Sequence, residues 1–535
     1  MDLIKENLLT ILILLPTVGA IAAIAYKAVT KDDSSQRWFA LIITTLNFLI
    51  SLLMFTRGVP AVGGFEFEQN VPWIPAIHTN YHVGVDGLSF WLVLLTTFIM
   101  PLSVLCAWTA VEKKKTAFFA FLLLLESAML GVFVTLDLLV FYLFFEASLI
   151  PMFFLIGVWG GKNRIYAAVK FFIFTAVGSL LMLVAIISLY YIYAGAVQGS
   201  GSFDFVEILA AMQSGKLVLG SQAGMLLFFA FALSFAIKVP IFPVHTWLPD
   251  AHTEAPTAGS VILAAILLKM GTYGLMRFNF AFFPDQARET AWIFITLAVI
   301  GIIYGALVAM VQPDWKRLIA YTSVAHMGFV VLGMFSFTEL GMQGAVYQML
   351  NHGVSTGALF ILVGFAYERR HTREISEYGG LANVMPNYAA IFIITTMSSI
   401  GLPFLNGFVG EFLIMVGMFK SNILIVTAAT NWNYVAAMAA GIGVILAAVY
   451  LLWLVQRVFF GKVTNPENKK LTDLNAREIG LMIPLLIAMV VMGVYPKPFL
   501  ERTDRAIKTI EARVMKSAGG AVEKTELDTK ALENR

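Results

Sequence analysis

Residues 225–275 read MLLFFAFALSFAIKVPIFPVHTWLPDAHTEAPTAGSVILAAILLKMGTYGL. Two apolar runs in this stretch flank a polar loop, and each run carries one lysine, Lys238 in the first and Lys269 in the second. Apolar runs that approach 20 residues predict helices that cross a membrane. Pro240 and Pro243 follow Lys238 closely, and each proline removes a helical hydrogen bond. The stretch therefore predicts a broken membrane helix and then a continuous one, each with a buried charge.

The composition of the whole chain supports a membrane environment. The 535 residues are 59% hydrophobic and only 13% charged, and the mean hydropathy is +0.82. A soluble fold cannot bury that much apolar surface. The net charge of +3 is small for this length and the sequence has no basic stripe, which argues against a nucleic-acid surface. A β-barrel would require many short strands of alternating hydrophobicity, and that pattern is not visible.

Apolar runs of membrane-crossing length occur about fourteen times, so the expected fold class is an all-α polytopic membrane protein. The runs begin near Leu8, Trp38, Leu88, Ala117, Leu138, Ala167, Met225, Gly259, Trp292, Leu318, Leu340, Tyr388, Val435 and Ile479. Lysine and arginine concentrate in the connections that follow odd-numbered runs. The positive-inside rule then places these connections in the cytoplasm and both termini outside. We expect residues 500–516 to form a surface helix and the rest of the tail to be disordered.

A second broken helix is expected in the twelfth run, residues 388–418, which Gly401 and Pro403 interrupt. Broken segments at corresponding places in two halves indicate a transporter built from repeats. We expect two inverted five-helix repeats, with ordinary proline kinks as the alternative. The expected division is helices 1–3 in 1–116, the first repeat with helices 4–8 in 117–278, the second repeat with helices 9–13 in 291–460, and helix 14 with a polar tail in 461–535.

Charged residues inside the apolar runs are the strongest functional signal. Glu146, Lys238, Lys269 and Glu411 lie deep in such runs, and Glu126 is a fifth such charge. A charge at mid-bilayer costs roughly 2.5–3.5 kcal/mol, so intramembrane charges usually mark ion pathways. Structural ion pairing between helices is the alternative, but both signs spread over many runs favour a pathway. Eight helical residues rise about 12 Å, so we expect Glu411 to lie away from the break at Pro403.

The histidines divide by place. His326 and His352 lie inside adjacent runs, which fits a proton relay better than two unrelated core histidines. His245 and His252 share a short loop with Asp250 and Glu254, and a divalent metal site is conceivable there. The prolines of this loop make it rigid rather than a helical face of ligands, so we expect no metal. A loop that caps the broken helix or admits protons is favoured.

No cofactor site is visible in the sequence. Cys106 is the single cysteine, which excludes an internal disulfide and an iron–sulfur cluster. No dinucleotide loop, phosphate loop or nucleophile elbow occurs. We therefore expect no cofactor in this chain and no redox chemistry of its own.

Three motifs resemble a known family. HVGVDGLSFW at 82–91, VHTWLPDAHTEAPTAGSVILAAILLKMGTYGLMRF at 244–278 and VQPDWKRLIAYTSVAHMGF at 311–329 are similar to signatures of the proton-translocating, antiporter-like subunits of respiratory complex I. That family includes subunits of Mrp-type antiporters and of membrane-bound hydrogenases. The resemblance implies that Glu146 and Lys238 are the family's acid–lysine pair, Lys269 its central lysine and Glu411 its terminal charge. Glu411 favours the branch with glutamate, because the other two bacterial complex I branches carry lysine there.

The resemblance also implies a function. The chain would be a proton-translocating membrane-arm subunit of an NADH:quinone oxidoreductase in the bacterial inner membrane. Protons would pass from the Glu146–Lys238 pair to Lys269, then through His326 and His352 to Glu411. Flavin, iron–sulfur clusters and quinone would belong to partner subunits. The partners would be other membrane-arm subunits, especially neighbouring antiporter-like ones, and the lipid bilayer, without nucleic acid. The alternatives are a stand-alone or Mrp-type cation/proton antiporter subunit and a scaffold whose buried charges only hold helices together.

Overall fold

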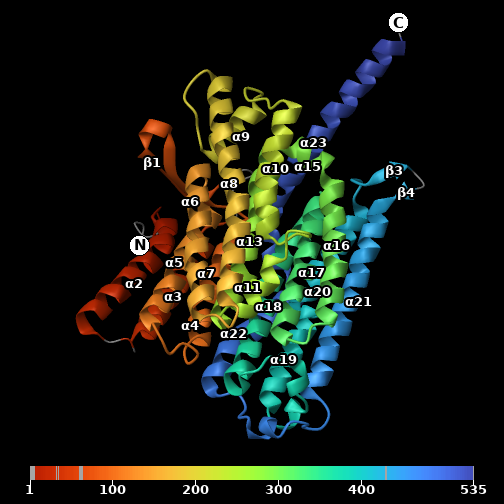
Figure 1. Ribbon diagram of the computed structural model, residues 1–535. Coiled ribbons are helices and arrows are strands. Elements are labelled where there is room, and N and C mark those ends of the chain that lie inside the picture. The colour runs from red at the N-terminus through yellow and green to blue at the C-terminus, as the bar shows by residue number, and fades with distance from the viewer. Residues whose placement is uncertain (1–5, 32, 34, 59–63, 428–429, 534–535) are drawn as a thin grey trace.

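The computed structural model is a bundle of long helices that run roughly side by side (Figure 1). It describes residues 6–31, 33, 35–58, 64–427 and 430–533. Large apolar side chains such as Leu226, Trp38 and Ile165 are exposed on the flanks of the bundle. Exposed apolar flanks of this kind suit contact with lipid.

Twelve helical stretches among the described residues are long and apolar enough to cross a membrane. They are α2 (Leu8–Thr30), α3 with the 3₁₀ turn η1 (Gln36–Ser51 and Leu52–Thr56), α5 (Lys115–Val134), α6 with α7 (Leu138–Ala147 and Leu149–Trp159), α8 (Arg164–Val197), α10 (Ser221–Lys238), α12 to α14 (within Thr257–Phe282), α16 (Ala291–Met310), α17 (Trp315–Phe335), α18 (Glu339–Arg370), α21 (Trp432–Phe459) and α22 (Ala476–Val494). The shorter apolar helix α4 (Phe90–Cys106) and the pair α19 (Pro386–Ser399) and α20 (Asn406–Lys420) match two further expected runs. The structure is thus the all-α polytopic bundle that the sequence predicts. The count of fourteen spans and the inverted repeats stay predictions.

The span that carries Lys269 is not a uniform α-helix. It consists of α12 (Thr257–Ile262), the π turn η3 (Leu263–Leu267), α13 (Leu268–Gly274), a second π turn η4 (Leu275–Asn279) and α14 (Phe280–Phe282). This span, α17 and α18 are almost wholly buried within the bundle, whereas α8 and α21 expose much of their surface. The three buried spans therefore form the interior of the molecule.

The first broken helix ends where the sequence predicts. Helix α10 stops at Lys238, and after a turn through the two prolines the chain resumes as α11 (Trp247–Glu254). Because Pro240 has no N–H to donate, the Ala236 carbonyl lacks its α-helical partner. The carbonyl accepts a hydrogen bond of 2.9 Å from the Ile241 backbone, because the turn brings that amide back over the helix end.

The second broken helix folds back on itself. Gly401 has a φ of +76° between α19 and α20, a conformation that favours glycine. A Cβ atom on Gly407, in the first turn of α20, would meet the carbonyl oxygen of Ser398, near the end of α19, at 2.1 Å. The end of one helix and the start of the next therefore lie against each other.

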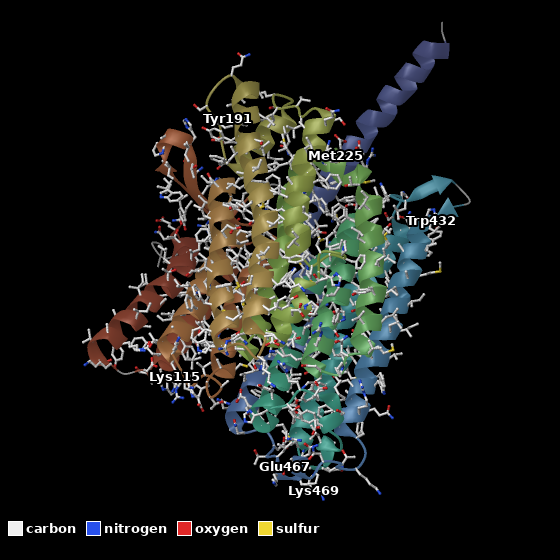
Figure 2. The ribbon with its side chains drawn as sticks, viewed as in Figure 1. Lys115, Tyr191, Met225, Trp432, Glu467 and Lys469 are labelled. Carbon is white, nitrogen blue, oxygen red and sulfur yellow. The ribbon has the colours of Figure 1, made fainter. Side chains whose placement is uncertain are left out.

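The two ends of the bundle differ in composition. Lys115, Glu467 and Lys469 mark one end, and Tyr191, Met225 and Trp432 mark the other (Figure 2). We call these the Lys469 end and the Trp432 end. The Lys469 end also carries the short helices η5 (Ile375–Glu377), η6 (Leu381–Asn383) and η7 (Pro466–Lys470).

A hairpin lies towards the Trp432 end (Figure 1) and is absent from the sequence predictions. Strands β1 (Glu66–Ile74) and β2 (Thr79–Val85) pair antiparallel, with the turn η2 (Pro75–Ile77) between them. A smaller pair, β3 (Ile425–Thr427) and β4 (Thr430–Asn431), precedes α21. The helices α9 (Phe205–Gln213) and α15 (Pro284–Glu289) also belong to this end.

The C-terminal helix α23 (Lys497–Glu533) packs on the Trp432 end and then projects away from the bundle (Figure 1). It contacts α18 and α15 in its first half, where Ile507 and Val514 are buried. The predicted surface helix at 500–516 is thus present, whereas the disorder predicted for the rest of the tail stays a prediction.

Candidate functional site

The interior spans bring Lys269 and His352 into direct contact. The Lys269 ammonium lies 2.6 Å from Nδ1 of His352 and donates to the Ala264 carbonyl at 2.5 Å. Ala264 belongs to the π turn η3, which precedes Lys269 on the same span. Both side chains are almost completely buried. The Lys269 ammonium therefore has the Ala264 carbonyl as a hydrogen-bond acceptor and the titratable His352 ring as a direct neighbour.

The row of titratable groups continues to Glu411. The rings of His352 and His326 lie edge to face with centroids 5.8 Å apart. Nε2 of His326 lies 3.7 Å from Oε1 of Glu411. The spatial order is therefore Lys269, His352, His326, Glu411, so the predicted order of the two histidines is reversed. The order differs because α18, the later helix, is the one that places its histidine against Lys269.

Glu411 lies close to the helix break, not away from it. A Cβ atom on Gly401 would stand 2.8 Å from Oε2 of Glu411, so the glycine leaves room for the carboxylate. The Gln348 amide donates to Oε1 of Glu411 at 3.2 Å. The expected separation of Glu411 from the break fails because α20 folds back along the end of α19. The backbone of Ser399, at the end of α19, interacts with His326.

Lys238 and Glu146 are neighbours without a direct ion pair among the described residues. The Lys238 ammonium lies 3.4 Å from the Ser148 hydroxyl and 4.8 Å from the centre of the Phe145 ring. Glu146 is half-buried and interacts with Ser179 on α8. Lys238 is nevertheless within electrostatic reach of Glu146, as the predicted pair requires.

The two lysine-bearing helices approach each other closely beside Lys238. A Cβ atom on Gly271 would meet the Phe235 carbonyl at 2.7 Å and the Val239 side chain at 2.8 Å. The missing side chain at this position lets α13 pack against the end of α10. Lys238 and Lys269 therefore sit on helices in contact, although no hydrogen bond joins the two side chains in the described structure.

Glu126 lies outside this row. The Asn47 amide on α3 donates to its carboxylate at 2.8 Å and to the Leu12 carbonyl at 3.3 Å. Glu126 is completely buried between α2, α3 and α5. No hydrogen bond or ion pair of the described residues connects it to Lys238 or Lys269.

The loop histidines have different neighbours. His245 packs against the rings of Phe242 and Tyr304, with centroid distances of 5.5 and 5.2 Å. His252 stacks on Phe360 of α18 at 4.6 Å, and neither of its ring nitrogens bonds to another described residue. The positive charges of Lys316 and Lys269 also act electrostatically on His252. It therefore lies beside the buried row.

The acidic residues of this loop bond elsewhere. Asp250 forms ion pairs with Lys170 at 2.6 Å and Arg317 at 3.5 Å. Glu254 accepts the Asn163 backbone amide at 2.9 Å. Among the described residues, no group of three or more histidine, cysteine, aspartate or glutamate side chains converges as metal ligands would.

The sequence reasoning missed Lys316. Its place next to a connection between two apolar runs predicts an exposed residue, yet only 6% of Lys316 is exposed. Asp314 caps α17 by accepting the backbone amides of Lys316 and Arg317 at 2.8 and 3.1 Å, so the helix starts early enough to carry Lys316 inward. Aspartate is a favoured N-cap residue, so Asp314 is the sequence signal that the helix begins before Lys316.

Polar groups without charge also surround the break near Glu411. Ser355 and Ser398 share a hydrogen bond of 2.7 Å, and the Asn406 amide donates to Ser355 at 3.2 Å. Asn351 donates to Gln348 at 2.9 Å. Single serines and amides inside apolar runs gave no distinctive pattern, so these residues could not be selected from the sequence.

A separate polar cluster anchors the hairpin outside the membrane spans. His82 on β2 bonds through one ring nitrogen to Asp204 and through the other to Glu68, the latter at 2.9 Å. Burial lowers the pKa of His82, but the hydrogen bonds and negative charges of Asp204 and Glu68 outweigh it, so the pKa is raised above 6.5. The sequence reasoning did not single out this histidine.

Comparison with known proteins gives concordant results. Residues 135–456 match the model of a family described as NADH:quinone oxidoreductase/Mrp antiporter, TM. The chain is 48% identical over 497 residues to NADH-quinone oxidoreductase subunit M of Rhodobacter capsulatus, covering 92% of this chain and 94% of the relative. It is 42% identical over 499 residues to subunit M of Rickettsia prowazekii, covering 93% and 97%.

A solved structure agrees. The fold is similar to a chain of respiratory complex I from Thermus thermophilus with bound NADH, with a TM-score of 0.83 and 32% identity over 95% of this chain and 99% of that one. Both named relatives are called subunit M. The chain therefore belongs to the antiporter-like membrane subunits of the NADH:quinone oxidoreductase/Mrp antiporter family, within the subunit M branch of complex I.

Proposed function

We propose that this chain moves protons across the bacterial inner membrane through the row Lys269, His352, His326 and Glu411, with Lys238 and Glu146 as the preceding pair. The redox chemistry of partner subunits supplies the energy, and flavin, iron–sulfur clusters and quinone reside there. The single observation that carries the proposal is the close succession of titratable side chains in the bundle interior, with contacts of 2.6 and 3.7 Å at its two ends.

The chemistry of the row suits proton transfer. Imidazole accepts a proton on one nitrogen and releases one from the other, which lets His352 and His326 pass protons between a lysine and a carboxylate. Moving one charge fully across the membrane costs about 2.3 kcal/mol per 100 mV. A subunit without its own energy source must therefore be coupled to partners, and its relatives are named as parts of NADH-quinone oxidoreductase.

The decisive experiment is Glu411→Gln in the whole complex, reconstituted in proteoliposomes. Glutamine keeps the acceptor for the Gln348 amide but cannot ionise, so we expect an assembled complex with severely reduced proton uptake per NADH oxidised. Glu411→Asp keeps the acid on a shorter arm and should retain partial activity. Glu126→Gln is the matched control, because it makes the same change at a buried acid outside the row. Normal pumping by assembled Glu411→Gln would refute the proposal.

The Mrp-type antiporter alternative differs in its partners. A complex I subunit copurifies with flavin and iron–sulfur proteins, whereas a stand-alone antiporter subunit does not. Affinity purification of the tagged chain from its native membrane, followed by flavin and iron analysis, separates the two. Absence of both cofactors from an intact preparation would favour the antiporter.

A further inference from the structure

A cavity of about 730 Å³ opens at the Lys469 end, between the connection after α4, the loop around α11 and the end of α18. Its lining includes Thr109, Ala110, Glu254, Lys316 and Glu368. Six of its nineteen lining residues are aspartate, glutamate, lysine or arginine, in a protein of which only 13% of the residues belong to these four types. The cavity is therefore a polar recess in an otherwise apolar bundle.

Lys316 is a buried member of this lining. Its ammonium donates to the Ala255 carbonyl at 2.5 Å, at the end of α11. Almost none of the side chain is exposed, although it lines the cavity. Its charge has no carboxylate within ion-pair distance among the described residues. Structural buried charges are normally paired, so a buried lysine that lines a polar cavity without a carboxylate partner requires another explanation.

His252 lies within electrostatic range of both Lys316 and Lys269. It precedes Ala255 by three residues on α11, and both Lys316 and Lys269 act on its ring electrostatically. His352, the partner of Lys269, in turn feels the charge of His252. The ring is completely buried and both its nitrogens are without a hydrogen-bond partner in the described structure, so both are available to take up and release a proton.

We infer that this recess is the opening through which protons reach the row, and that Lys316 passes them to His252 and so to Lys269. The inference deepens the proposed function and rests on it. In each step one proton moves from a nitrogen that is protonated to one that is not, so Lys316 returns to its charged form by taking a proton from the recess. Glu368 and Glu254 stand at the recess and can supply it.

Substitution of Lys316 tests its role. Lys316→Arg keeps the charge and a donor for the Ala255 carbonyl, but a guanidinium does not release its proton. We expect the complex to assemble with NADH-linked proton uptake lowered about tenfold or more, within the range of a positioned proton donor. Arg317→Lys is the matched control, since this neighbour in the same helical turn points to Asp250 instead. A purely structural Lys316 would leave Lys316→Arg at the parental rate.

A chemical block tests the recess independently. Ala110→Cys places a reactive thiol in the lining, and the native Cys106 is too deeply buried to compete. In inverted membrane vesicles, a membrane-impermeant methanethiosulfonate should lower proton uptake of the Ala110→Cys complex several-fold. Lys469→Cys places a thiol at an exposed position of the same end outside the recess, so it shows whether labelling by itself lowers proton uptake. The parental complex treated alike controls for other subunits.

The outcomes separate the two proposals. Loss of pumping in Glu411→Gln together with full pumping in Lys316→Arg and in labelled Ala110→Cys overturns the inference and leaves the proposed function standing. Full pumping in all three overturns the proposed function itself. Loss in all three supports both.

Discussion

The fold brings Gly401 next to the carboxylate of Glu411, which lies ten positions further along the chain. Gly401→Ala introduces a Cβ 2.8 Å from the Glu411 carboxylate, at a φ of +76°. We expect this change to destabilise the chain by about 1–3 kcal/mol and to impair pumping, because the carboxylate must move away from His326. The measurement is proton uptake per NADH together with the thermal stability of the complex.

A substitution at Gly461 is the control that distinguishes the effect of backbone strain from the effect of the contact with Glu411. Gly461 has a φ of +86°, and a Cβ there would meet nothing within 4 Å. Gly461→Ala should therefore cost backbone strain alone and leave pumping intact. Equal pumping in the two variants would show that the Gly401–Glu411 contact does not matter for transport.

At the residue scale, the sequence predicts which titratable residues lie inside the bundle better than it predicts which of them are in contact. Lys269, His326, His352 and Glu411 were selected because charged or titratable groups are rare in apolar runs, and the structure brings them together. Their order and the contact between Glu411 and Gly401 depend on how helices fold back, which no local pattern records. Lys316 was missed because a basic residue next to a connection normally belongs to it.

At the element scale, a buried hydrogen bond between Asn47 and Glu126 joins helices α3 and α5. Asn47→Leu removes the donor to Glu126 and leaves a buried carboxyl without its partner. We expect a loss of about 1–3 kcal/mol in the stability of the assembled complex. The double variant Asn47→Leu, Glu126→Met removes both polar groups and should recover most of that loss. Thermal unfolding of the four members of this cycle measures the coupling.

The hairpin responds to pH through His82. Its folded-state pKa is raised above 6.5, so the stabilisation is fully present below pH 6.5 and disappears as the pH rises through the raised value. We expect hydrogen exchange of residues 66–85, corrected for intrinsic rates, to accelerate between pH 6 and pH 9. His82→Gln should abolish this difference. His78→Asn at the exposed hairpin turn is the control and should preserve it.

Most helices are predictable from the sequence. The exceptions are the hairpin β1–β2 and the course of the chain after each helix break. Long apolar runs identify membrane helices because lipid demands internal hydrogen bonding. The hairpin β1–β2 was missed because only its second strand is largely buried, so residues 66–74 lack a regular hydrophobic pattern. The prolines identified both breaks, but not the direction in which the chain resumes.

At the scale of the whole molecule, the basic connections gather at one end. Lys115 and Lys469 lie at that end, and Tyr191 and Trp432 lie at the other (Figure 2). The positive-inside rule predicts that the Lys469 end faces the cytoplasm. Single cysteines at Lys115 and Lys469 should react with an impermeant reagent in inverted vesicles and not in right-side-out spheroplasts. Cysteines at Tyr191 and Trp432 should show the opposite pattern. The reverse result would place both termini inside.

The two π turns of the central span have a consequence for how its length can change. Each wide turn, Leu263–Leu267 and Leu275–Asn279, accommodates a residue beyond the α-helical repeat. A single insertion or deletion inside such a turn is absorbed locally, so Lys269 keeps its direction. The same deletion in Leu268–Gly274 would rotate everything beyond it by about 100° relative to the rest. Homologues whose central span differs in length by one residue should therefore differ at these two turns, while the segment between them keeps its length.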